Sequence, residues 1–150
     1  MAGNEDILKQ ARQRARDMGL PYAGALLPGE AYALLQQQPG ARVIDVRSRA
    51  ELDFVGRIPG SVEIEWKIYP GMLPNPNFIQ QLTQQVPQDA VAMFICRSGG
   101  RSHATAMAAA QAGYSNAYNV LEGFEGDRDA GGHRNTVGGW RAAGLPWVQS

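Results

Sequence analysis

Two segments near the start of the chain repeat apolar residues at helical spacing. In the first, at 5–18, the apolar positions lie three or four residues apart, acidic residues stand at the start and a glycine follows the end. The apolar residues at this spacing are Leu8, Ala11, Ala15 and Met18. The second segment begins at Pro28, a residue favoured in the first helical turn, and stops at Pro39-Gly40. The pattern predicts two amphipathic helices.

Beyond residue 40, short apolar runs alternate with helical patterns. Strands are predicted at 41–46, 61–64, 91–95 and 117–120, and helical segments at 49–55, 77–86 and 103–111. The stretch 66–77 contains three prolines and is predicted to be an extended surface loop. Strands that alternate with helices predict an α/β fold, with an open, mainly parallel sheet of about five strands flanked by helices on both faces.

Length and charge narrow the class of protein. A chain of 150 residues is typical of one domain, so we predict a single domain over 1–150, with an N-terminal helix at 5–18 and an irregular, glycine-rich tail at 121–150. Fourteen basic side chains balance fourteen acidic ones, which gives no broad attraction to nucleic acid. No run approaches the roughly 18 apolar residues that cross a bilayer, and the start MAGNEDILKQ lacks the apolar core expected of a secretory signal. We expect a cytoplasmic protein without nucleic-acid or membrane partners.

The single cysteine, Cys96, directly follows the most apolar predicted strand, 91–95. Open α/β sheets bind ligands at the carboxyl ends of their strands. Consecutive glycines in the loop that follows can turn backbone N–H groups inward, and Arg97 and Arg101 add positive charge, so the surroundings favour a thiolate. We therefore expect Cys96 to be a nucleophile and the loop to bind an anion, such as the outer sulfur of a persulfide. Without this loop, a buried structural cysteine would be the simpler interpretation.

The sequence CRSGGRS at 96–102 resembles the active-site loop of the rhodanese family. DVRSRAE at 45–51, GRIPGS at 56–61 and the stretch 113–123 are similar to other landmarks of that family, and the resemblance covers about 28–124. The closing GHRNTVGGWRAAGLPW resembles tails of some bacterial single-domain members. The resemblance implies a sulfurtransferase, in which Cys96 takes sulfur from a small anionic donor such as thiosulfate or a persulfide. The resulting persulfide passes that sulfur to cyanide or to a thiol.

The resemblance also assigns roles around Cys96, the catalytic residue. The substrate-binding residues are Arg97, Ser98, Gly99, Gly100, Arg101 and Ser102, whose amides are expected to surround the sulfur. Arg97 is expected to meet the donor, and Arg101 to brace the loop as well as to bind substrate. In support of the site, Arg47 and Glu51 are expected to form an ion pair, with Asp45 packed behind.

Two further features bear on the expected chemistry. Arg57 stands where the family often has histidine, and this extra cation is expected to shift the preference among anionic donors. His103 and His133 have no metal-ligand spacing to other histidines, cysteines or carboxylates. We therefore expect no metal and no cofactor.

Three alternatives share the same residues. A cysteine-dependent phosphatase also uses a thiolate in a loop of backbone amides that ends at an arginine. Such phosphatases resemble one another in placing five residues between the cysteine and the arginine, whereas this chain has four between Cys96 and Arg101. The tighter loop suits a sulfur atom better than a phosphate. Arsenate reduction would need a second cysteine or an external thiol. A non-catalytic or carrier module remains open because fold does not fix function, and no protein partner is indicated.

Overall fold

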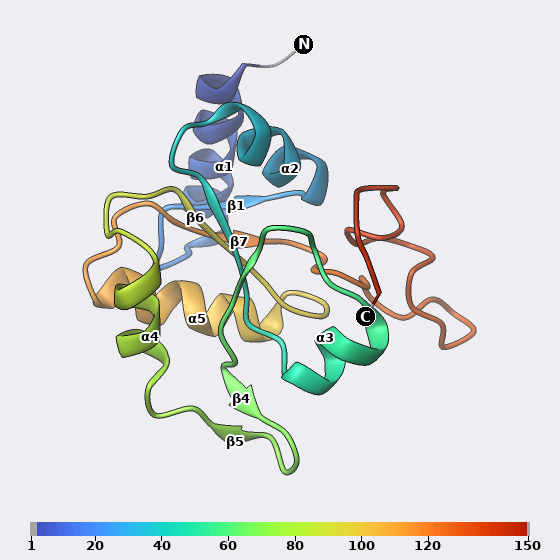
Figure 1. Cartoon of the computed structure of the whole chain (residues 1–150). Coiled ribbons are helices and arrows are strands. Elements are labelled where there is room, and N and C mark those ends of the chain that lie inside the picture. Colours follow the sequence, from blue (N-terminus) through green and yellow to red (C-terminus); the bar gives the residue numbers. More distant parts are fainter. Residues whose placement is uncertain (1–2, 150) are drawn as a thin grey trace.

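The computed structural model describes residues 3–149 and contains a five-stranded sheet in the order β1-β7-β6-β2-β3, in which every neighbouring pair is parallel (Figure 1). The strands are β1 (Gly24–Leu26), β2 (Arg42–Asp45), β3 (Val62–Glu63), β6 (Ala92–Ile95) and β7 (Ala117–Val120). The helices are α1 (Asn4–Met18), α2 (Pro28–Gln37), α3 (Arg49–Val55), α4 (Phe78–Gln85) and α5 (Gly100–Gln111). The predicted parallel α/β fold is confirmed. The outermost positions of the predicted domain, 1–2 and 150, lie outside the described residues.

Successive residues of the central strands pack on opposite faces of the sheet, as the two-residue period of a strand requires. Val43 and Met93 pack with α1 and α2 on one face, and their neighbours Ile44 and Phe94 pack with α4 and α5 on the other. Figure 1 shows these two pairs of helices on opposite sides of the sheet. Both faces of the sheet are therefore covered, and the buried β6 lies between β2 and β7.

Three local features differ from the sequence prediction or refine it. The strand β1 was not predicted, because its three residues are too few to form a pattern. Gly24 lets it lie close to α1, since a Cβ there would stand 2.8 Å from the Ala11 carbonyl carbon. Within the predicted loop 66–77, β4 (Lys67–Ile68) and β5 (Leu73–Pro74) form a short antiparallel hairpin. The helix α5 begins at Gly100 rather than His103, because the chain already turns at Gly99.

The tail after β7 has no helix or strand in the described residues up to 149, but it is packed against the rest of the fold. Trp140 is fully buried, and Arg57 and Val148 exchange two backbone hydrogen bonds of 2.8 and 2.9 Å. Figure 1 shows the tail beside α3, where Arg141 donates to the Val55 carbonyl at 3.1 Å. The segment predicted as irregular is thus an ordered cover over one end of the sheet.

None of the helices in the described chain has the length and apolar character that a membrane span requires.

Candidate active site

Cys96 lies immediately after β6, at the carboxyl end of the central strands. Its side chain is a free thiol in a residue only 1% exposed. The Gly99 N–H donates to the Cys96 Sγ over 3.1 Å, and the Ser102 Oγ stands 3.3 Å from the same sulfur. The sulfur is therefore held by polar groups of the loop and the first turn of α5, rather than by apolar packing alone.

The loop reaches this geometry because Gly99 has a left-handed backbone, with φ of 112°. A side chain there would have room, with 3.7 Å to the nearest atom, so conformation and not space requires glycine. The His103 amide makes the first hydrogen bond of α5, to the Gly99 carbonyl at 3.1 Å. The amides of the three helical residues before it therefore have no acceptor within the helix and concentrate positive potential beside the sulfur. Sγ itself receives one amide hydrogen bond, and the wider amide cradle stays a prediction.

Asn119, in β7, hydrogen-bonds to residues of the cysteine loop and of α5. The sequence analysis did not identify it as a site residue. It is 3% exposed, and its Oδ1 accepts the Ser102 hydroxyl at 2.5 Å while its Nδ2 donates to the Gly99 carbonyl at 3.3 Å. A polar residue inside the apolar strand 117–120 was the available signal, because a buried amide must find partners. Asn119 thus connects β7 to Gly99 and Ser102, the two residues whose polar groups contact the Cys96 sulfur.

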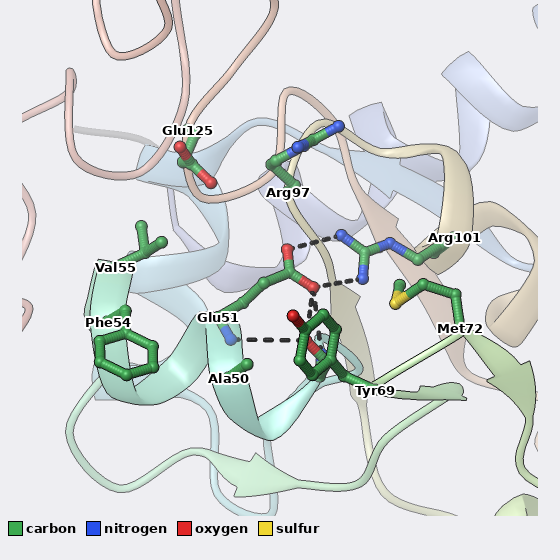
Figure 2. Close-up of a pocket in the computed structure, with 10 residues that line it drawn as sticks. Ala50, Glu51, Phe54, Val55, Tyr69, Met72, Arg97, Arg101 and Glu125 are labelled. Carbon is green, nitrogen blue, oxygen red and sulfur yellow. Dashed lines mark hydrogen bonds and ion pairs between the residues drawn. The ribbon is translucent and has the colours of Figure 1, made fainter.

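Arg101 pairs with Glu51 in the first turn of α3. Its two terminal nitrogens donate to the two Glu51 carboxylate oxygens at 2.7 and 2.8 Å (Figure 2). Glu51 also caps α3 by accepting from the Ser48 N–H at 3.2 Å. Burial alone would raise the pKa of Glu51, but the hydrogen bonds and charge of Arg101, helped by Ser48, lower it to about 2. The hydrogen bond to Glu51 in turn raises the pKa of Arg101.

The predicted ion pair between Arg47 and Glu51 is wrong. Arg47 pairs instead with Asp45, with nitrogen–oxygen distances of 2.9 and 2.7 Å, and both side chains are fully buried. The guanidinium also donates to the Gly56 carbonyl at 2.8 Å and lies 4.1 Å above the Phe124 ring. A charge this deep requires a close counter-charge, and Asp45 is two residues away while Glu51 is held by Arg101.

Arg57 does not act as a free cation. Its guanidinium contacts the Asp53 carboxylate and donates to Glu63 at 3.0 Å. Two carboxylates therefore offset its charge, which removes the reason to expect an effect on anionic donors.

Residues that follow β7 fasten the backbone of the cysteine loop. The Phe124 N–H donates to the Cys96 carbonyl at 2.8 Å, and the Glu125 N–H donates to the Arg97 carbonyl at 2.9 Å. The close approach needs Gly123, because a Cβ there would lie 2.6 Å from the Cys96 carbonyl oxygen. The stretch 113–123, which resembles a family landmark, thus ends in direct contact with the site.

A cleft of about 670 Å³ opens beside this loop, between α3 and the β4–β5 hairpin. Its apolar wall consists of Ala50, Phe54, Val55, Tyr69 and Met72, and its polar groups come from Ser48, Glu51, Arg97, Arg101 and Glu125. Figure 2 shows the Glu51–Arg101 pair across the middle, with Phe54 and Tyr69 below it and Arg97 and Glu125 above it. The sequence analysis found the loop residues of this cleft but not its apolar wall.

Comparisons with known proteins identify the family. The family model of the Rhodanese-like domain matches residues 27–130. An uncharacterized protein from Rickettsia prowazekii is 34% identical over 120 residues, covering 79% of this chain and 91% of the relative. The chain therefore belongs to the rhodanese-like family.

Two solved structures are similar as well. The crystal structure of Rv0390 from M. tuberculosis is 43% identical with a TM-score of 0.79, covering 86% of this chain and 99% of that one. The polysulfide-sulfur transferase homodimer from Wolinella succinogenes is 18% identical with a TM-score of 0.60, covering 100% of this chain and 95% of that one, which shows a shared fold.

Proposed function

We propose that this protein is a sulfurtransferase that carries sulfane sulfur as a persulfide on Cys96. The Cys96 thiolate attacks the outer sulfur of a donor such as thiosulfate, and sulfite leaves with the electron pair of the broken S–S bond. Cyanide or a thiolate then attacks the outer sulfur of the persulfide, which releases thiocyanate or a new persulfide and restores the Cys96 thiolate. No external oxidant or reductant enters either step.

The observation that carries the proposal is the Gly99 N–H that donates to the Cys96 sulfur at 3.1 Å, at the start of α5. A persulfide adds one anionic sulfur beyond Sγ, and the unpaired amides at the start of this helix supply positive potential there. Arg97 follows the cysteine directly and lines the cleft, where it can meet an anionic donor. The reaction needs no general base once Cys96 is a thiolate.

The orientation of Arg101 separates this proposal from phosphatase chemistry. A phosphatase uses the arginine after its loop to bind the phosphoryl oxygens, but here both terminal nitrogens of Arg101 donate to Glu51, whose carboxylate offsets the arginine's charge. A loop with four residues between Cys96 and Arg101 also leaves a small anion site. Both features support sulfur as the transferred atom.

Steady-state assays test the function. Thiosulfate and cyanide should yield thiocyanate with the unaltered protein and none above background with Cys96→Ser. An aryl phosphate is assayed in parallel. Hydrolysis of the aryl phosphate without formation of thiocyanate would show that the protein is a phosphatase and not a sulfurtransferase.

A further inference from the structure

The cleft beside Cys96 presents large apolar side chains to solvent. Phe54 is 80% exposed and Tyr69 is 61% exposed, although both are aromatic and line the same cavity. Thiosulfate and cyanide are small and polar and gain nothing from such a wall. Exposed apolar surface gathered in a cleft is typical of a binding site for a molecule with an apolar part.

The charges of the cleft limit what that molecule carries. Arg101 is paired with Glu51, and Arg97 makes no ion pair within residues 3–149, so Arg97 is the cation of the lining that no carboxylate contacts directly. Glu125 adds a negative charge on the Arg97 side of the Glu51–Arg101 pair (Figure 2). Such a cleft favours one negative charge, held near Arg97, and disfavours a body with further negative groups.

We propose, on the basis of the function argued above, that the sulfur acceptor is a hydrocarbon-bodied thiol, aromatic or branched aliphatic, whose thiolate faces Arg97 while its body lies against Phe54, Tyr69 and Met72. The thiolate attacks the outer sulfur of the Cys96 persulfide, an S–S bond forms to the acceptor, and the original S–S bond breaks with its electron pair on Cys96. The products are the acceptor persulfide and the free Cys96 thiolate, and charge is conserved. The cavity of about 670 Å³ lies within the size range of small-molecule sites.

The two half-reactions allow this proposal to be tested separately from the function itself. In the first half-reaction, thiosulfate loads Cys96 with sulfur. The second half-reaction is measured as the loss of the Cys96 persulfide after addition of thiophenol, or of 2-mercaptoethanol, which lacks the apolar body. The variants are Phe54→Ser and Tyr69→Ser, and Leu73→Ser is the matched control, because Leu73 is 65% exposed on the same hairpin but does not line the cleft.

Loading by thiosulfate should be the same in all variants, which also shows that they are folded. Transfer to thiophenol should slow by about tenfold in Phe54→Ser and Tyr69→Ser, the scale of losing part of an aromatic contact, and transfer to 2-mercaptoethanol by less than about twofold. Leu73→Ser should match the unaltered protein. Equal rates of transfer to thiophenol in all proteins, or equal reductions of the rate with both thiols, would overturn the proposal. The apolar side chains of the cleft would then bind another partner, such as a protein surface. Failure to load Cys96 in the unaltered protein would instead overturn the function.

Discussion

Glu51 and Arg101 stand fifty residues apart in the sequence and join the start of α3 to the first turn of α5 through two hydrogen bonds of 2.7 and 2.8 Å. The pair thereby connects the element after β2 to the element that carries the cysteine loop. Because Glu51 also caps α3 through Ser48, one carboxylate holds both a helix end and the arginine beside the site.

Replacement of Glu51 by glutamine should weaken this connection without changing the size of the side chain. We expect the free energy of unfolding to fall by roughly 1–3 kcal/mol, because a partly buried arginine loses its counter-charge. Urea denaturation measures the change. Glu5→Gln, on the exposed side of α1, is the control and should change stability by less than about 0.5 kcal/mol. Equal stability of Glu51→Gln and the unaltered protein would show that the pair contributes nothing net.

The same carboxylate predicts a dependence of stability on pH. The pKa of Glu51 is lowered in the folded state to about 2 from an ordinary value of 4.5, so the unfolded chain binds a proton more readily. Its contribution is therefore complete above pH 4.5 and is lost as the pH falls from 4.5 toward 2. The stability difference between the unaltered protein and Glu51→Gln should be constant above that interval and shrink within it. A difference that grows on acidification would contradict the assignment.

Adjacent glycines in the cysteine loop give opposite predictions. Gly99 has φ of 112°, so Gly99→Ala should strain the turn and move the N–H that donates to Cys96. We expect loading with sulfur to slow by at least about tenfold and stability to fall by roughly 1–2 kcal/mol. Gly100 is helical and an added Cβ meets nothing within 4 Å, so Gly100→Ala should fold normally and be slightly more stable. Equal loading rates in the two variants would contradict the role of Gly99.

Asn119 should act on the site through Ser102 and Gly99. Asn119→Leu has a similar volume but leaves the Ser102 hydroxyl and the Gly99 carbonyl without this partner, and we expect a loss of roughly 1–3 kcal/mol in stability and slower loading of Cys96. Asn116→Leu, at a half-buried position just before β7, is the control. Loading rates, corrected for the folded fraction, measure the effect. If the corrected loading rate of Asn119→Leu equals that of the unaltered protein, Asn119 stabilises the fold and does not position the site.

The sequence predicted the parts of the fold that have long, regular patterns. The helices at 5–18 and from Pro28 appear within one residue of their predicted limits, because each has a clear apolar period. The three residues of β1 were missed, since they become a strand only through pairing with β7 and packing on α1. The packing of the tail was missed too, because it depends on close contacts such as that of Gly126 with the Gly138 carbonyl, which a local pattern does not contain.

The candidate site was predictable in its residues but not in its pairings. The loop of Cys96 has a local signature, and the structure places its glycine turn and helix start around the sulfur. The partner of Arg47 was mispredicted because several carboxylates were available in sequence, and only the fold decides that Asp45 is adjacent while Glu51 meets Arg101. The apolar wall of the cleft combines Phe54 from α3 with Tyr69 from the β4–β5 hairpin. No spacing of residues along the chain predicts that these two elements line one cleft.

Intact-mass spectrometry of the protein after exposure to thiosulfate tests the central claim most directly. The account predicts a mass gain of one sulfur atom, absent in Cys96→Ser and removed by cyanide with release of thiocyanate. A mass that stays unchanged, or a gain that persists in Cys96→Ser, would contradict a persulfide on Cys96.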